Sequence, residues 1–346
     1  MLNKNNGFTL SFHFGTDVSG KYAFTFITLF IILILIYSNS FYGDWHFDDF
    51  ANIVINPHIQ IKSFSLAEIK HCMYGIYHDR LLRPLSYLSF ALNYKLGGMD
   101  VFGFHVVNFI IHYLSAVFLF LFIYNTLKLP RLKDEYENIA YPVALLATFF
   151  WALNPVWVTS VTYIVQRMAS MAGLFYIMSM YFYLKGRTSA HISKRPISSI
   201  LFFILCITSG LAAVLSKENA VMLPVSILLF DLFLIQGITK KNIIKYIKIS
   251  ILPVLLILII GFIYTGRFHN VSGGYELRDF SLTQRLLTEP RVILSYLSLL
   301  FYPIGSRLTF LYDIEISRSL LQPWTTIPSI FLISFIIGFA FYIARK

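Results

Sequence analysis

The chain has 346 residues, of which 57% are apolar and only 13% are charged. About a quarter of the residues of a soluble domain are charged, so this composition excludes a water-soluble globular protein and predicts an integral membrane protein. The net charge of +11 does not indicate nucleic-acid binding, because no basic run interleaved with stacking aromatics lies in a water-soluble segment.

The first predicted transmembrane helix covers residues 22–42. A hydrocarbon core about 30 Å thick requires about 20 helical residues, and this stretch is long enough and carries no charge. It is longer than the apolar region of a signal peptide, and no A-x-A cleavage site follows it. We therefore expect a membrane helix with its N-terminus in the cytoplasm.

Residues 43–98 form a long mixed segment that cannot cross lipid, because acidic and basic side chains occur along it. Its last part, residues 84–96, is apolar but too short to span a bilayer. An interfacial or re-entrant helix is expected there.

The rest of the chain brings the predicted total to about eight membrane helices in a single all-α domain, residues 1–346. A second large polar loop is expected at residues 266–325, with a short interfacial segment at 291–304. The remaining spans are predicted at residues 101–127, 141–165, 168–184, 198–215, 220–235, 249–265 and 328–343.

The distribution of basic residues sets the expected orientation. Cytoplasmic loops of multi-pass proteins are enriched in Lys and Arg. With the N-terminus inside, the basic clusters at residues 128–133, 185–195, 240–248 and 345–346 all lie in the cytoplasm. Both large loops, 43–98 and 266–325, are then predicted to be extracytoplasmic.

Asp48 and Asp49 lie a few residues after the first predicted helix, flanked by Phe47 and Phe50. Two adjacent carboxylates can act as a general base or bind a divalent cation, Mg²⁺ or Mn²⁺. The alternative is a solvated acidic pair in a loop. Because successive loop residues point apart, one carboxylate is expected to face the site while its neighbour holds the loop. Asp49 is favoured as the base, and Asp48 as the orienting or metal-linked partner.

Cations on the same side are candidates for binding a phosphate. Arg83 can grip a phosphate with its guanidinium fork, or it can reach lipid headgroups from a structural position. Lys217 can face a substrate phosphate while Glu218 orients it, or the two can form an ion pair that caps the turn. Arg167, at the outer end of the third span, adds another cation.

A polar stripe is expected on the helix at residues 101–127. His105, Asn108, His112 and Ser115 recur at spacings of three, four and three, which places them on one helix face. His112 lies about 16 Å into the membrane, where interhelical hydrogen bonding is the favoured reading. His105 is shallow enough to line an outward-facing cavity.

Several motifs, in order, resemble bacterial relatives of the transmembrane-and-tetratricopeptide O-mannosyltransferases, within the GT-C glycosyltransferase superfamily. Their order and spacing fit from about residue 22 to residue 312. The matching segments are FDD at 47–49 with NP at 56–57, RPLSYLSFALNY at 83–94, GFHVVNFIIH at 103–112, LNPV at 153–156, YIVQR at 163–167 and SKEN at 216–219.

The resemblance implies a GT-C fold and transfer of a sugar from a polyprenyl-phosphate-linked donor on the extracytoplasmic side, with inversion. An acidic residue of the first outer loop is then the general base, or it sits at the metal or acceptor site. Asp48 and Asp49 match the family's paired acidic positions, and the segments of Arg83 and Lys217 match those that border the donor site. A protein hydroxyl is the expected acceptor, and a bacterial inner membrane the expected location.

The sequence departs from the family pattern in two respects. Eukaryotic members often carry an acidic residue shortly after the position of Arg167, where Met168, Ala169 and Ser170 follow here. The 346 residues also contain no tetratricopeptide repeats. The portion that recruits the acceptor is then expected to be absent, to be supplied by a partner subunit, or not to be needed. The alternative function is a non-catalytic membrane scaffold, or a lipid-binding subunit of a larger assembly, that retains the fold.

The orientation can be tested by labelling. A cysteine introduced near Asn56 or Gly273 should react with an impermeant thiol reagent added from outside, and one near Asn242 should not. The reverse labelling pattern would contradict the extracytoplasmic placement of both large loops.

Overall fold

The computed structural model describes residues 18–76, 81–191, 196–265, 275, 278–309 and 313–344. These residues form helices joined by turns, without a strand, which confirms the predicted all-α class. The α-helices are α1 (Val18–Tyr37), α2 (Leu66–Cys72), α3 (Pro84–Gly97), α4 (Val101–Leu127), α5 (Pro130–Tyr136), α6 (Ala140–Ala152), α7 (Val158–Thr162), α8 (Arg167–His191), α9 (Pro196–Ser216), α10 (Leu223–Phe230), α11 (Lys240–Thr265), α13 (Leu282–Phe301) and α14 (Thr326–Ala344).

Five helical stretches among the described residues are long and apolar enough to cross a membrane, and a sixth is added if the bent pair Pro130–Ala152 and Pro155–Thr162 is one span. They support a multi-pass membrane protein. The five are Gly20–Ser40, Val101–Leu127, Pro196–Ser216, Glu218–Gln236 and Thr326–Ile343. The other two predicted spans are also helical, as α8 and α11. Helix α8 packs against both α4 and α9, so it can carry small and polar residues that a lipid-facing helix would not.

The third predicted span, residues 141–165, is not one continuous helix. Helix α6 ends at Ala152, and the chain bends by 49° before α7. The side chain of Asn154 accepts a hydrogen bond from the Val156 N–H and caps a new turn that starts at Pro155. Because proline lacks a backbone N–H and clashes with the preceding turn, α6 cannot continue through this position.

Two other elements differ from their predicted limits. The span predicted at 220–235 begins as a tight 3-10 turn, Glu218–Met222, continues as α10 and ends in a wide π turn, Asp231–Gln236. Helix α13 begins at Leu282, nine residues before the predicted interfacial segment. Ser281 and Gln284 form a capping box there, which satisfies two free N–H groups and fixes the earlier start.

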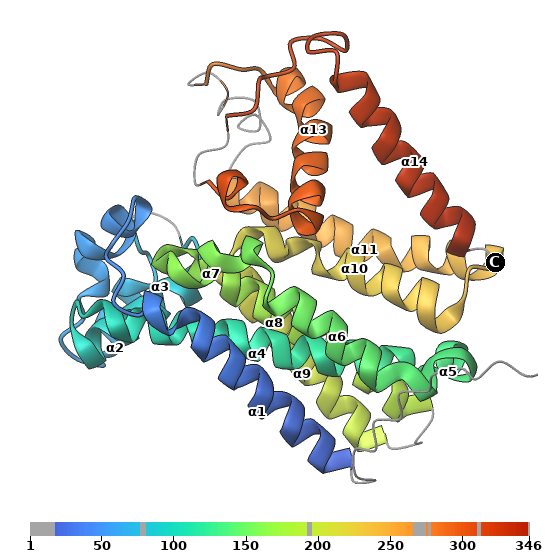
Figure 1. Cartoon of the computed structure of the whole chain (residues 1–346), viewed down its shortest axis with the longest axis horizontal. Helices are drawn as coiled ribbons and strands as arrows, with labels where there is room; N and C mark the ends of the chain where they lie inside the picture. Colours follow the sequence, from blue (N-terminus) through green and yellow to red (C-terminus); the bar gives the residue numbers. More distant parts are fainter. Residues whose placement is uncertain are drawn as a thin grey trace, which may run out of the picture.

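The first loop has a hydrophobic core of its own. Ile53, Ile59, Tyr87 and Phe90 are buried together with Ile164 from the turn that precedes α8. Figure 1 shows α2 and α3 gathered at one end of the bundle, where α1 ends and α4 begins. The loop is therefore fixed against this end of the bundle, which we call the loop end.

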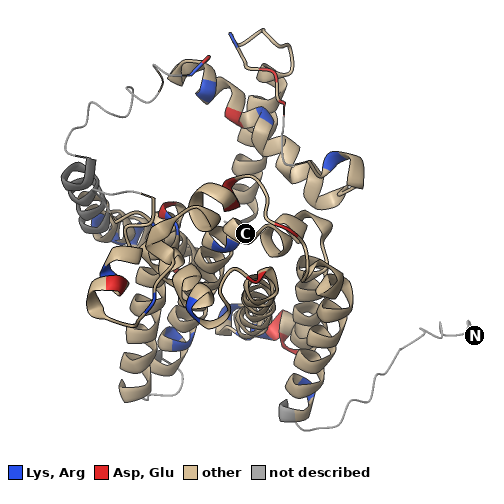
Figure 2. Ribbon diagram, turned by 90° about the vertical axis from the view of Figure 1, so that its left-hand side faces the viewer, with Lys and Arg blue, Asp and Glu red and all other residues tan. Residues whose placement is uncertain are grey.

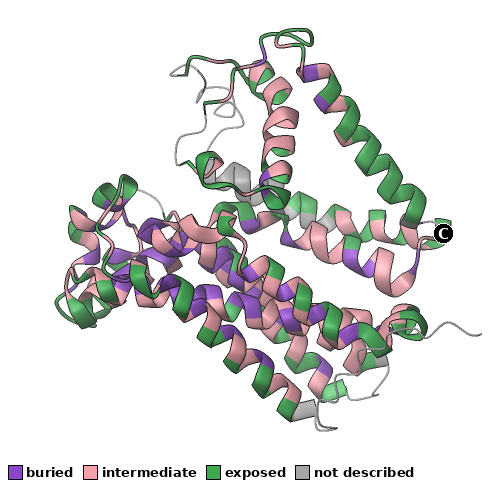
Figure 3. Ribbon diagram, in the orientation of Figure 1, coloured by how far each residue is buried: buried purple, intermediate pink, exposed green. Residues whose placement is uncertain are grey.

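Burial is concentrated in the interior helices. Figure 3 shows buried positions along α4 and α8, whereas α14 is exposed along most of its length. Charged residues are sparse along the ribbons (Figure 2). A large exposed apolar surface is expected where helices contact lipid.

Candidate functional site

The buried guanidinium of Arg167 lies at the centre of the loop end. Its side chain is completely buried, and it donates hydrogen bonds to four oxygens on two other helices. These are Asn108 Oδ1 at 2.7 Å, Asn93 Oδ1 at 2.6 Å, the Phe104 carbonyl at 2.8 Å and the Ser89 carbonyl at 3.2 Å. The guanidinium also lies over the rings of Phe90 and Phe104. Arg167, predicted to bind the donor phosphate, is therefore enclosed by protein and joins α3, α4 and α8.

Asp49 is fully buried, and both of its carboxylate oxygens accept backbone N–H groups. Oδ1 accepts from Val165 at 2.7 Å, and Oδ2 accepts from His46 at 3.0 Å. Burial raises the pKa of Asp49, and the two backbone hydrogen bonds oppose that rise. This carboxylate ties the first loop to the turn before α8.

Asp48 differs from its neighbour, because its side chain is exposed. Its backbone is held from two sides: its N–H donates to the Tyr163 hydroxyl at 2.9 Å, and its carbonyl accepts from Asn52 at 2.9 Å. No hydrogen bond or ion pair to the Asp48 carboxylate is found among the described residues. Of the two acids, Asp48 is the one that a ligand can reach.

Arg83 and Glu218 form an ion pair between segments that are 135 residues apart. Nε and Nη2 of Arg83 reach the two carboxylate oxygens of Glu218 at 2.8 and 2.5 Å. Arg83 has a positive φ of 58°, in the left-handed region, directly before Pro84. A non-glycine residue in this conformation is uncommon and is often found at functional sites.

Lys217 does not pair with Glu218, although the two are adjacent. Its side chain is half-buried and makes no hydrogen bond or ion pair within the described part of the chain. Burial, together with the nearby Arg83 guanidinium, lowers the pKa of Lys217, while Glu218 opposes this effect. The predicted alternative of a Lys217–Glu218 cap is wrong, because Arg83 takes the Glu218 carboxylate.

Contacts to the turn before α8 bring the acidic loop and the basic residues together. Asp49 is anchored at Val165, and Nη1 of Arg83 lies 3.5 Å from the Met168 sulfur, three residues later. Ser86, at the start of α3, donates to the carbonyl of Ser216, immediately before Lys217. The candidate site therefore comprises Asp48, Arg83 and Lys217, whose segments are linked through this turn and through Ser86, and Asp49 and Arg167 are its buried supports.

The polar stripe on α4 is buried, as expected of residues that face protein. Asn108 donates to the Ile164 carbonyl at 3.2 Å while it accepts from Arg167. His112 is hydrogen-bonded to the Ala152 carbonyl, which confirms interhelical bonding. His105 is 1% exposed and is hydrogen-bonded to the Gly43 carbonyl, so it supports the loop rather than lining an open cavity.

Sequence reasoning missed several positioning residues. Asn93 holds Arg167, the Tyr163 hydroxyl holds the Asp48 backbone, and Tyr87 donates to Asn52 at 2.7 Å. A signal for Asn93 was present: Ser86, Ser89 and Asn93 follow a helical spacing on the otherwise apolar α3. Such a stripe indicates that one face of the helix packs against polar groups.

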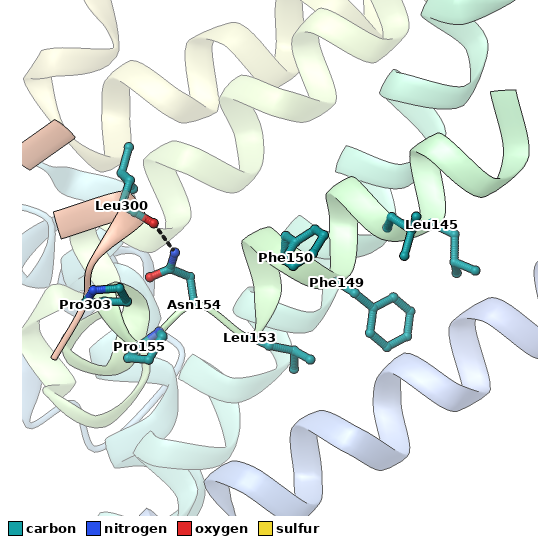
Figure 4. Close-up of a pocket in the computed structure, with 9 residues that line it drawn as sticks. Leu145, Phe149, Phe150, Leu153, Asn154, Pro155, Leu300 and Pro303 are labelled. Atoms are coloured by element: carbon teal, nitrogen blue, oxygen red, sulfur yellow. Dashed lines mark hydrogen bonds between the residues drawn. The ribbon is translucent and has the colours of Figure 1, made fainter. Parts of the chain in front are cut away.

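An apolar groove of about 690 Å³ lies beside the break between α6 and α7. Figure 4 shows Phe149 and Phe150 on α6, with Leu153 directly after it, on one side, and the end of α13 with Leu300 on the other. The side-chain amide of Asn154 donates to the Leu300 carbonyl at 3.1 Å across the groove. The groove can accept an extended hydrocarbon chain.

Comparisons with known proteins confirm the resemblance seen in the motifs. The chain is 28% identical to Protein O-mannosyl-transferase TMTC4 of Homo sapiens over 229 residues, which cover 63% of this chain and 30% of that protein. It is 24% identical to Protein O-mannosyl-transferase F38B6.6 of Caenorhabditis elegans over 306 residues, 86% of this chain and 40% of the relative. The chain thus spans less than half the length of these relatives. No family model matches the chain, and no solved structure matches it.

The burial of Arg167 predicts a structural phenotype. Arg167→Gln should lower the thermal unfolding midpoint markedly, because it leaves buried oxygen acceptors without donors, and each unsatisfied buried polar group costs about 1–3 kcal/mol. The measurement is thermal unfolding of the purified protein in detergent. Arg285→Gln is the matched control and should change little, because this guanidinium is exposed, as are its hydrogen bonds to Glu289 and to the Tyr275 hydroxyl. An Arg167→Gln variant with wild-type stability would contradict the structural role.

Proposed function

We propose that the chain is a membrane glycosyltransferase that transfers a sugar from a polyprenyl-phosphate-linked donor to a hydroxyl group of a protein acceptor. The exposed Asp48 carboxylate carries the proposal: it has no hydrogen-bond or ion-pair partner among the described residues, and Tyr163 and Asn52 hold its backbone in place. The relatives are named as protein O-mannosyl-transferases, which supports transfer of a sugar to protein. The lipid-linked donor and the extracytoplasmic location of the site are part of the proposal.

The proposed reaction is a single displacement. The acceptor hydroxyl gives its proton to the Asp48 carboxylate, and its oxygen forms a bond to the anomeric carbon of the sugar. The bond between that carbon and the phosphate oxygen breaks from the opposite face, and the lipid phosphate leaves with the electron pair. One displacement of this kind inverts the anomeric configuration, and positioned cations stabilise the charge that develops on the phosphate.

The geometry leads us to exchange the roles first expected for the two acids. Asp49 is enclosed and accepts two backbone N–H groups, so it is a positioning residue that locks the loop. Asp48 is the proposed base. A divalent cation would have Asp48 as its only free carboxylate from this pair, and no step of the proposed reaction depends on a metal.

Lys217 is the proposed main contact for the departing phosphate. Its ammonium group is not engaged within the described residues, whereas Arg83 is already bound by Glu218. Arg83 can add its charge while Glu218 holds its orientation. The groove beside Phe150 and Asn154 is proposed to hold the prenyl chain.

The roles of the two acids can be separated by kinetics and stability. Asp48→Asn should reduce sugar transfer about 10²–10⁴-fold with an unchanged thermal midpoint, because it removes an exposed general base. Asp49→Asn should lower the thermal midpoint, because it disturbs a buried carboxylate that joins two segments. The assay is sugar transfer from a polyprenyl-phosphate donor by the purified chain, with thermal unfolding in parallel. Wild-type transfer rates in Asp48→Asn would exclude Asp48 as the base, and an inactive wild type with every donor would favour the scaffold alternative.

Donor binding gives a separate test of Lys217. Lys217→Gln should weaken binding of the lipid-phosphate donor by about tenfold or more, since a hydrogen bond to a charged group contributes about 1.5–3 kcal/mol. Lys95→Gln is a control on the first loop, because Lys95 is committed to the Lys62 carbonyl. Equal donor affinity in the wild type and in Lys217→Gln would remove Lys217 from the proposed site.

A further inference from the structure

A second, smaller cavity of about 230 Å³ lies far from the candidate site. It is formed where α4 passes into α5, at the end of α8 and beside the π turn Asp231–Gln236. Thr188 on α8 lines it, 21 residues after Arg167. With a helical rise of 1.5 Å per residue, the two positions are about 31 Å apart, roughly the thickness of the hydrocarbon core. The cavity is therefore at the opposite end of α8 from the loop end, at a separation that matches the two surfaces of a bilayer.

Arg187, which lines this cavity, forms a buried ion pair with Asp231. Nε of Arg187 donates to Asp231 Oδ1 at 2.7 Å, and the Asp231 side chain is 1% exposed while that of Arg187 is 19% exposed. The Tyr246 hydroxyl from α11 donates to the other oxygen of Asp231. These contacts fix Arg187 on the cavity wall, and the Asp231 carboxylate balances its charge.

Arg131 supplies a second guanidinium, whose charge no carboxylate balances within the described residues. It is exposed, and within the described residues its guanidinium makes one hydrogen bond, from Nη1 to the Phe233 carbonyl at 3.1 Å. A Cβ atom on Gly237 would lie 2.6 Å from the same Nη1, so the absence of a side chain there leaves room for the guanidinium. The remaining donors, Nε and Nη2, are available to a ligand.

The rest of the cavity suits an amphiphile. Leu129, Leu234 and Ile235 give it an apolar wall. Lys240 and Lys241 begin α11 a few residues after Gln236, which also lines the cavity, and both are exposed. Basic pockets between membrane helices, at the level of the headgroups, bind anionic phospholipids.

We propose that this cavity binds the headgroup phosphate of an anionic phospholipid, with Arg131 as the contact that supplies uncompensated positive charge, beside Arg187, which Asp231 neutralises and holds in place. A guanidinium binds phosphate through two parallel hydrogen bonds, which gives geometry as well as charge. The apolar wall then meets the first part of the acyl chains. The proposal is independent of sugar transfer, because it involves the opposite end of α4 and α8.

The test measures lipid binding by the full chain in a neutral detergent. The thermal unfolding midpoint is followed as phosphatidylglycerol or phosphatidylcholine is added. We expect saturable stabilisation by phosphatidylglycerol that is weakened about tenfold or more in Arg131→Gln, as expected for lost charge-assisted contacts. Lys133→Gln removes an equal charge from the same short helix, at an exposed position paired with Glu137, and should bind within about twofold of the wild type.

Thr188→Phe fills the cavity while it keeps both arginines, so it decides the question if Arg131→Gln fails to fold. It should abolish the stabilisation by phosphatidylglycerol. Equal stabilisation by phosphatidylcholine, or equal losses in Arg131→Gln and Lys133→Gln, would overturn the proposal in favour of nonspecific lipid or diffuse surface charge. Equal protection by inorganic phosphate alone would overturn the lipid assignment in favour of a soluble anion.

Discussion

The arrangement of the loop end depends on one constraint, the burial of the Arg167 charge. A guanidinium without access to water must have its donors satisfied by protein, since an unpaired buried charge costs several kcal/mol. Arg167 meets this requirement only when Asn93 on α3 and Asn108 on α4 are both within reach. Because these partners come from segments 59 and 74 residues away, the guanidinium fixes α3 against α4 and α8.

The turn that carries Arg167 also positions the groups available for chemistry. The Val165 N–H donates to Asp49, and the Tyr163 hydroxyl accepts from the backbone of Asp48. Met168, in the first turn of α8, contacts Arg83. The buried and paired residues thus form a support, and the exposed Asp48 carboxylate, which has no partner in the described part of the chain, projects from it. This division between support and free group is common at catalytic sites, where precise placement requires rotamers locked by neighbouring contacts.

The two ends of the bundle share their helices but differ in their chemistry. The loop end carries the exposed Asp48 carboxylate and the cations Arg83 and Lys217, and an apolar groove opens where α6 is broken at Asn154. At the other end, Arg131 and Arg187 face a cavity of a size suited to a headgroup. Between the two ends, α4 and α8 pack against each other, and the His112 ring is hydrogen-bonded to the Ala152 carbonyl. Binding at one end therefore does not require an open polar path through the membrane.

Local composition determined the membrane class, the positions of the helices and the motifs that resemble the O-mannosyltransferases, because hydropathy and short motifs are properties of contiguous residues. It also placed the α4 stripe on one buried face, since helical spacing is fixed. Only tertiary structure decided which of the two adjacent aspartates is exposed, which cation is buried and which residue pairs with Glu218. The Asp49 carboxylate accepts a hydrogen bond from the backbone of Val165, 116 residues away, and Glu218 forms an ion pair with Arg83, 135 residues away. Burial and pairing set the charge and access of an ionisable group, and in this protein both come from segments distant in the sequence.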